Sequence, residues 1–312
     1  MIDVYDIIAA NPLDRGVDMP ICRLCPRECG VDRSFDQGRC GVGELPRVAR
    51  AALHSWEEPC ISGTRGSGAV FFSGCPLGCI YCQNDKISRH GWGIEITIGR
   101  LREIMEELIA QGAHNINLVN PTHYTDAVLE ALEEGLPVPL VWNSSGYEKP
   151  DSLRRLNGRV QIFLPDLKYS DSQLAERYSR AADYSTVARE AITTMVELVG
   201  PPIFDSDGLL QRGVLIRHLV LPGCEENTRG VIDWVADAFP SGEVLFSLMG
   251  QYTPCGRAIG DPLLGRRLTD GEYAWAKNYL RCSGIQSGYV QDISSADKMY
   301  IPAFDGAGVA RQ

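Results

Sequence analysis

The chain has 312 residues, of which 44% are hydrophobic and 22% are charged, a composition typical of a globular protein with a sizeable core. Its formal net charge of −10 argues against general nucleic-acid binding, which depends on a basic surface. No apolar run approaches the ~20 residues of a membrane-spanning helix, and the acidic N-terminus does not resemble a secretory signal, so we expect a cytoplasmic protein that binds neither nucleic acid nor membranes.

Residues 1–60 are rich in Cys, Arg, Gly and Pro and show little hydrophobic periodicity. Cysteines that cluster in a reducing compartment more often bind metal than form disulfides, and the total of eleven would leave one thiol unpaired. Four cysteines within 19 positions are enough either for a zinc site or for a second iron–sulfur cluster, and their spacing does not choose between them. We expect this segment to be held by its own metal, with the ligands Cys22, Cys25, Cys29 and Cys40.

Residues 61–290 alternate between short apolar strands and amphipathic helices. Six strand–helix units in succession require a parallel sheet with helices outside it, because each crossover must return the chain to the same end of the sheet. The pattern therefore predicts an α/β fold, a partial (β/α)6 barrel of parallel strands, with a doubly wound sheet as the alternative and residues 291–312 as a C-terminal tail. The strands are expected at 69–74, 115–120, 138–146, 160–168, 214–223 and 243–252, and the helices at 101–112, 126–135, 150–156, 171–181, 186–200, 230–239 and 270–281.

The first of these strands runs directly into the loop SGCPLGCIYCQN at residues 73–84, with its cysteines in C-x3-C-x2-C spacing. Three thiolates cannot close a structural zinc site, which takes four protein ligands. They can hold three irons of a [4Fe–4S] cluster and leave the fourth iron open to a non-protein ligand. We predict such a cluster on Cys75, Cys79 and Cys82, with a zinc site completed by a distant fourth ligand as the alternative.

The stretch CPLGCIYC resembles the cluster loop of the radical S-adenosylmethionine (SAM) superfamily, including the aromatic Tyr81 before the last cysteine. Together with HSWEEPC, YCQN and the upstream CRLCPREC, it is similar to the pyruvate formate-lyase activating enzyme-like branch with an N-terminal Cys-rich extension. The resemblance covers residues ~20 to ~290. It implies a radical SAM oxidoreductase in which one electron from the cluster cleaves SAM to a 5′-deoxyadenosyl radical, which abstracts hydrogen from a substrate.

The resemblance also implies which strand ends bind SAM. The second strand ends in NPTH, where activating enzymes usually carry GGEP; the third ends in NSSG, similar to their DTNG, and the fourth in DLK, similar to their D-x-K pair. The fifth strand carries an arginine that matches one reaching SAM. The implied SAM-binding residues are Tyr81, Pro121, Asn143, Ser144, Asp166, Lys168, Arg217 and Gln251.

Substrate and partner are less narrowly defined. In activating enzymes the radical passes to a glycine of a partner, so a glycyl radical enzyme is the first candidate, a small molecule or peptide the second, and a non-catalytic iron–sulfur electron carrier the alternative from another class. His54 and His123 are candidate substrate-site residues, and Glu57 and Glu58 either face a substrate or cap a turn. A flavodoxin or ferredoxin would supply the electron, and because these donors are usually acidic, we expect a basic patch near the cluster loop, formed by Arg65, Lys86 and Arg89.

Overall fold

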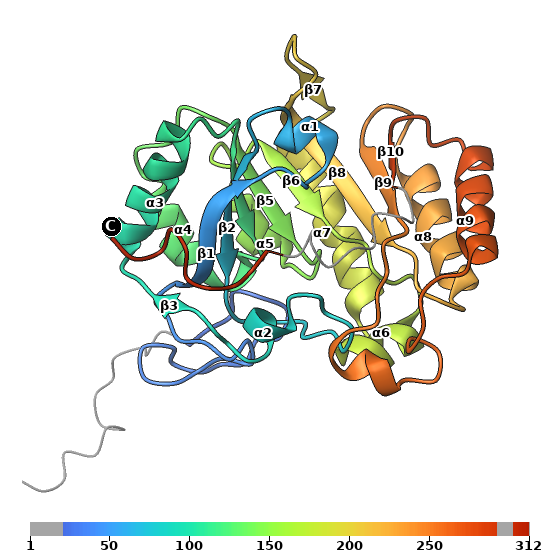
Figure 1. The fold of residues 1–312 in the computed structure, drawn as a ribbon, viewed down its shortest axis with the longest axis horizontal. Coiled ribbons are helices and arrows are strands. Elements are labelled where there is room, and N and C mark those ends of the chain that lie inside the picture. The colour runs from blue at the N-terminus through green and yellow to red at the C-terminus, as the bar shows by residue number, and fades with distance from the viewer. Residues whose placement is uncertain (1–20, 292–301, 312) are drawn as a thin grey trace, which may run out of the picture.

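The computed structural model describes residues 21–291 and 302–311. Over these ranges one mixed sheet is flanked by helices (Figure 1). The strands are β1 (Arg47–His54), β2 (Ser67–Phe72), β3 (Ile94–Glu95), β4 (Ile116–Val119), β5 (Leu140–Ser144), β6 (Ile162–Pro165), β7 (Ile203–Phe204), β8 (Leu210–Leu219), β9 (Leu245–Met249) and β10 (Gly288–Val290). The helices are α1 (Pro59–Ser62), α2 (Asp85–Ser88), α3 (Ile98–Ala110), α4 (Thr125–Ala131), α5 (Pro150–Arg154), α6 (Ser172–Ser179), α7 (Tyr184–Val199), α8 (Glu225–Ala238) and α9 (Asp270–Cys282), with 3-10 turns η3 (Thr122–Tyr124) and η4 (Gly256–Gly260).

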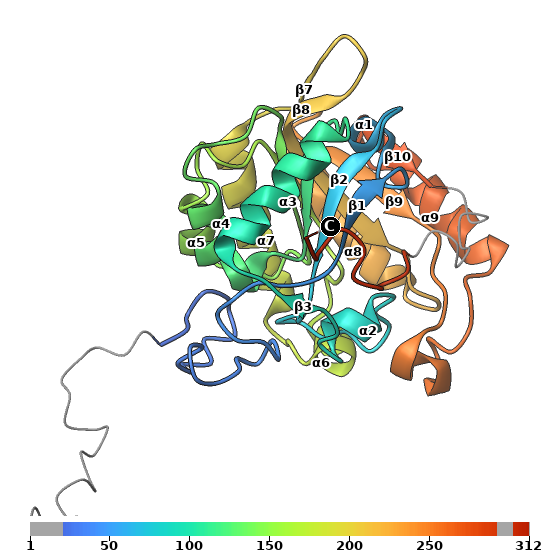
Figure 2. The ribbon, with the colours of Figure 1, turned by 60° about the vertical axis from the view of Figure 1, so that its left-hand side comes forward.

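The order of the parallel strands decides between the two expected architectures. Neighbouring strands follow one another along the chain as β2-β4-β5-β6-β8-β9-β10, and each of these pairs is parallel. A doubly wound sheet would reverse this order at a switch point. Because the order never reverses, every right-handed crossover places its helix on the same outer face; α3 and α9 lie at the two flanks, with the strands between them (Figure 1; Figure 2 gives a second view). The predicted partial (β/α)6 barrel is confirmed.

The sheet begins earlier in the chain than the sequence pattern indicates. Strand β1, within the expected N-terminal segment, pairs antiparallel with β2 from Val48–Phe72 to His54–Ser67. The described part of the C-terminal tail, residues 302–311, also lies on β1, where the Ala51 amide donates to the Ala307 carbonyl over 2.9 Å. In the described part of the expected N-terminal segment, residues 21–46, which hold the four N-terminal cysteines, precede the sheet.

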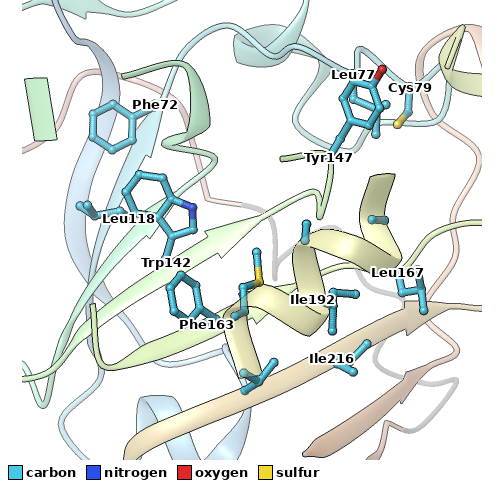
Figure 3. Close-up of a cluster of buried hydrophobic side chains, with 14 of the residues drawn as sticks. Phe72, Leu77, Cys79, Leu118, Trp142, Tyr147, Phe163, Leu167, Ile192 and Ile216 are labelled. Atoms are coloured by element: carbon cyan, nitrogen blue, oxygen red, sulfur yellow. The ribbon is translucent and has the colours of Figure 1, made fainter. Parts of the chain in front are cut away.

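The core lies between the sheet and its outer helices. Trp142 of β5, Phe163 of β6 and Ile192 of α7 each have 0% of their surface exposed and pack in one cluster (Figure 3). Full burial of such a side chain contributes about 1.5–3 kcal/mol to folding. The strands are therefore a rigid platform for the loops at their ends.

The two ends of the barrel differ in what they carry. The carboxyl ends of the parallel strands face α2, α6 and residues 21–46, at the bottom of Figure 1, whereas α1 and β7 lie at the opposite end. In the ranges that the structure describes, no helix is long and apolar enough to cross a membrane. Functional side chains at the carboxyl ends of such strands share one mouth.

Candidate functional site

A cavity of about 1050 Å³ lies inside the open barrel. Its wall at one end includes all three cysteines of the loop after β2, and at the other end Glu57, Glu58 and residues of β10. Side chains from the ends of β4, β5, β6, β8 and β9 line the space between. One cavity therefore joins the predicted cluster loop to the predicted cofactor residues.

Hydrogen-bond donors point at each sulfur of the cluster loop. The amides of Leu77 and Gly78 lie 3.4 and 3.5 Å from Cys75 Sγ. Ser179 Oγ of α6 donates to Cys79 Sγ over 2.9 Å, and Ser88 Oγ of α2 donates to Cys82 Sγ over 3.2 Å. Donors aimed at sulfur stabilise a thiolate, which is the form that binds metal.

Two of these sulfurs are costly to ionise without a metal. Burial raises the pKa of the Cys79 thiol, and burial followed by repulsion from Cys75 and Cys79 raises that of Cys82 to about 12. A metal that takes the place of the proton removes this cost. Three adjacent thiols that line a cavity and accept hydrogen bonds fit three corners of a [4Fe–4S] cluster.

Four charged side chains form a ladder along the cavity. Lys168 Nζ lies 2.6 Å from Asp166 Oδ2, and Arg217 Nε lies 2.9 Å from Asp166 Oδ1. Arg217 continues the ladder to Glu57 Oε2 over 3.2 Å and donates to Asn143 Oδ1 over 2.7 Å. Asp166, which follows β6, and Arg217 of β8 lie close together because they are partners in a parallel β-bridge.

This ladder leads from the predicted cluster loop into the barrel. Burial alone would lower the pKa of Lys168, but attraction to Asp166 and, at the loop end, to Cys79 and Cys82 raises it above its usual value. Burial alone would raise the pKa of Asp166, but Arg217 and Lys168 outweigh it, so the pKa lies below its usual value. Lys168, Asp166 and Arg217 are therefore charged at neutral pH.

Glu58 stands beside the ladder and remains incompletely paired. Its Oε1 accepts from Ser247 Oγ over 2.7 Å and from Gln291 Nε2 over 2.9 Å. Its Oε2 is buried with no hydrogen-bond partner in the described part of the chain, and burial raises the pKa of this carboxyl. Glu58 precedes α1 without capping it, so of the two expected roles the side chain takes the one that faces the cavity.

Most of the predicted SAM-binding residues line the cavity. Tyr81, Asn143, Ser144, Asp166, Lys168, Arg217 and Gln251 do so. Gln251 Oε1 and Ser145 Oγ are buried there without a partner among the described residues. Unpaired buried polar atoms are rare in folded proteins, so these two atoms indicate that the cavity receives a polar ligand.

Pro121 and His123 are placed elsewhere. Neither lines the cavity; Pro121 precedes η3, and His123 Nε2 lies 2.8 Å from the Ser73 carbonyl. Burial lowers the pKa of His123 to about 3, so this histidine is neutral and supports the start of the cluster loop. His54 does line the cavity.

The sequence analysis did not single out Asn120. This residue has a left-handed backbone with φ 59°, and its Nδ2 donates to the Gly74 carbonyl over 2.9 Å, which fixes the loop beside Cys75. Its sequence signal is only its tolerance of positive φ. Glu57, for which the sequence left two roles open, lines the cavity and ends the charge ladder.

The four N-terminal cysteines lie in one compact segment. The Cys22 amide donates to Val31 over 2.8 Å, and a Cβ added to Gly38 would lie 3.2 Å from Cys40 Sγ and 3.4 Å from Cys29 Sγ. Burial, then repulsion from the other three thiols, raises the pKa of Cys25. In the described ranges, no three His, Cys, Asp or Glu side chains are already arranged around a single-ion position. The fit of this segment to a metal rests on its four neighbouring thiols.

The N-terminal segment is bound directly to the cluster loop. The Cys75 amide donates to the Cys40 carbonyl over 3.1 Å. Arg27 lies across both parts, with Nε donating to the Pro76 carbonyl over 2.8 Å and Nη2 to the Ser179 carbonyl over 3.0 Å. The two cysteine groups are therefore parts of one rigid end of the barrel.

Fold and site together define a parallel α/β barrel protein with a three-cysteine loop at its mouth. No family model matches the chain. An uncharacterized protein of Methanocaldococcus jannaschii is 27% identical over 258 residues, 80% of this chain and 70% of that protein. A 7-carboxy-7-deazaguanine synthase of Methanothermobacter thermautotrophicus is 29% identical over 147 residues, 46% of this chain and 56% of the synthase.

Among solved structures, SuiB of Streptococcus suis bound to S-adenosylmethionine aligns with a TM-score of 0.45 and 12% identity. The alignment covers 71% of this chain and 46% of SuiB. The chain thus spans about half the length of the synthase and of SuiB.

Proposed function

We propose that this protein is a radical SAM enzyme, with a [4Fe–4S] cluster on Cys75, Cys79 and Cys82 and SAM beside it in the barrel. One observation carries the proposal. Three hydrogen-bonded cysteine sulfurs open into the same cavity as the charge ladder and two unpaired polar atoms. A cluster held by three thiolates leaves one iron open to a polar ligand, and polar side chains that could bind such a ligand line the cavity.

A bound, reduced cluster on Cys75, Cys79 and Cys82 would supply the single electron for reductive cleavage of the C5′–S bond of SAM, chemistry that would yield methionine and a 5′-deoxyadenosyl radical able to take a hydrogen atom from the substrate. The protein's own side chains would bind SAM and orient it beside the cluster. Arg217 and Lys168 suit the SAM carboxylate, and Asp166 and the free Gln251 Oε1 suit its ammonium group. Tyr81, which contacts Tyr169, Tyr178 and Tyr252 edge-on, closes the apolar wall and excludes water.

For the substrate we propose two candidates. A glycine of a partner enzyme is the first, because of the sequence resemblance to activating enzymes. A small molecule or peptide is the second, and the free Glu58 Oε2 deep in the cavity favours it. A buried unpaired carboxylate oxygen would bind a donor such as an amine or amide of a substrate that enters the barrel.

The enzyme class is tested on anaerobically reconstituted protein with dithionite and SAM. We expect 5′-deoxyadenosine and methionine in equal amounts, detected by chromatography, and none from Cys79→Ala. Cys282→Ala is the matched control because Cys282 is exposed on α9 and outside the cavity. A protein with a full complement of iron and sulfide that never cleaves SAM would be the electron carrier instead.

The substrate is narrowed by ultrafiltration of a cell extract into small-molecule and macromolecular fractions. The fraction that holds the substrate should accelerate 5′-deoxyadenosine formation. Acceleration by the macromolecular fraction, with an organic radical in the electron paramagnetic resonance (EPR) spectrum, supports glycyl radical activation. Acceleration by the small-molecule fraction that Glu58→Gln abolishes supports the second candidate.

For the N-terminal segment we propose a bound metal, either zinc or a second iron–sulfur cluster. Counting iron, zinc and sulfide in wild type and Cys22→Ala separates the two. Loss of zinc alone identifies a structural ion, and loss of iron with sulfide identifies a cluster. Identical metal and sulfide counts in the two proteins would contradict both.

A further inference from the structure

Three exposed arginines gather where the cluster loop meets the surface. Arg89 follows α2, Arg180 follows α6, and Arg257 lies in η4. The pKa of Arg257 is lowered by desolvation and by the positive charges of Arg89 and Arg180. All three therefore share one neighbourhood, although they are far apart in the sequence.

Contacts with Ile80, inside the cluster loop, explain why these elements meet. The Ile80 amide donates to the Tyr178 carbonyl of α6 over 2.9 Å, and the Ile80 carbonyl accepts from the Ala258 amide of η4 over 3.2 Å. A Cβ added to Gly256 would lie 3.5 Å from the Asp85 carboxyl carbon of α2. Figures 1 and 2 both show α2, α6 and the loop with η4 at the same end of the barrel.

The charge at this place is opposite to that of the whole chain. Two acids lie near the three arginines: Asp85, 3.6 Å from Arg89, and Asp261, which follows η4 and pairs with Arg177 of α6 over 3.0 Å. In the described ranges, no ion pair joins Arg180 or Arg257 to a carboxylate. The surface therefore carries an excess of positive charge on a protein whose formal net charge is −10.

An apolar side chain stands beside the arginines. Ile259, two residues after Arg257, has 67% of its surface exposed. An exposed apolar residue with charged neighbours is the pattern of small transient interfaces, where charge steers the encounter and apolar contact holds it. We call Arg89, Arg180, Arg257 and Ile259 the arginine face.

We propose that the arginine face docks a small acidic electron-transfer protein, which delivers the electron that the cluster needs. The proposal rests on the proposed function, because it assigns the donor site for that same cluster. In each encounter the donor loses one electron and the cluster gains it, across the Ile80–Tyr81 segment of the loop. Elsewhere the negative charge of the chain repels such a donor, and an attractive surface raises its association rate by about 10- to 1000-fold.

The arginine face replaces the patch expected from the sequence. Arg65 precedes β2 while the cysteines follow it, and its Nε donates to the Gly112 carbonyl over 2.9 Å. The six-residue strand β2 therefore places Arg65 about 20 Å from the cysteines of the cluster loop. Lys86 Nζ donates a hydrogen bond to the Phe304 carbonyl over 2.6 Å. Of the three expected residues, Arg89 alone belongs to the face.

The test is anaerobic stopped-flow reduction of the reconstituted protein by a reduced acidic flavodoxin, followed as bleaching of cluster absorbance. We expect Arg180→Glu/Arg257→Glu to lower the second-order rate at least tenfold at low salt and to weaken its salt dependence. Reduction by dithionite and the iron content should stay unchanged. Arg65→Glu/Arg212→Glu, at the opposite end of the barrel, makes the same change in net charge and should leave the flavodoxin rate within about twofold.

Equal loss of rate in both double variants would overturn the arginine face, and so would an unchanged rate in Arg180→Glu/Arg257→Glu. If that variant loses iron, Arg257→Gln with a salt titration of wild type replaces it; a rate that does not depend on salt in wild type contradicts the proposal. Failure of the proposed function shows itself separately, because a wild-type protein without a cluster would not bleach with dithionite either.

Discussion

Replacing Arg217 by methionine tests the charge ladder most directly. The side chains of Arg217, Asp166 and Glu57 are 15%, 18% and 11% exposed, so the ladder is largely shielded from water. Breaking a buried ion pair by removing one partner costs about 3–5 kcal/mol, because the other charge stays buried without compensation. Lys168 still pairs with Asp166, whereas Glu57 keeps only the Asn143 amide at 3.3 Å. We expect a loss near the lower end, about 3 kcal/mol in the free energy of unfolding.

Urea unfolding followed by circular dichroism measures this loss, with Arg154→Met as the control. Arg154 pairs with Asp151 on the surface, where the two side chains are 57% and 88% exposed, and such pairs contribute only about 0–1 kcal/mol. Asp166 has a folded-state pKa below its ordinary value, so its stabilisation is complete above that value and disappears as pH falls through the folded pKa. The penalty of Arg217→Met should therefore be full near neutral pH and shrink below about pH 4. A loss no larger than that of the control, or one that grows on acidification, would refute the reasoning.

Three further outcomes follow from the site. Burial raises the pKa of Glu58, so ionisation of this carboxyl destabilises the folded protein as pH rises above the ordinary pKa of 4.5. In thermal unfolding, the Glu58→Gln variant should therefore match or exceed the stability of wild type at pH 7. It should lose that advantage below about pH 4.5. Arg27→Gln removes the hydrogen bonds that the Arg27 guanidinium donates to the carbonyls of Pro76 and Ser179, each of which contributes about 1.5–3 kcal/mol to stability. Because these bonds hold the cluster loop in place, a chelator should remove iron from the loop faster in this variant than in wild type, while the N-terminal metal remains bound. Gly146→Ala should weaken SAM binding in equilibrium dialysis, because the backbone has φ 74° and the new Cβ would lie 2.3 Å from the Asp166 carbonyl oxygen; unchanged affinity contradicts this.

The sequence predicted what depends on local pattern. Apolar runs identified the parallel strands, and because parallel strands end at one mouth, Asn143, Asp166 and Arg217 could be expected to meet. The cysteine spacing likewise singled out one loop. Strand β1 was missed because Arg47 and Arg50 interrupt the apolar residues of its sequence, RVARAALH, and because it pairs antiparallel, outside the repeating unit.

Features that depend on contacts between distant segments could not be predicted. Arg27 reaches the cluster loop over 49 positions of sequence, and the arginine face joins residues from three separate loops. Glu57 reaches Arg217 across 160 positions. No periodicity records such contacts, because they are fixed by how the loops pack on the finished barrel.

The hydrogen bond from the Cys75 amide to the Cys40 carbonyl bears on how the protein can be divided. A fragment trimmed to the repeating strand–helix units would retain Asp166, Lys168 and Arg217 of the charge ladder but lose Glu57, and it would also lose the wall against which Gly74 packs, 2.8 Å from the Cys40 carbonyl oxygen for an added Cβ. The smallest piece that keeps this wall beside the three-cysteine loop must therefore start upstream of Cys40.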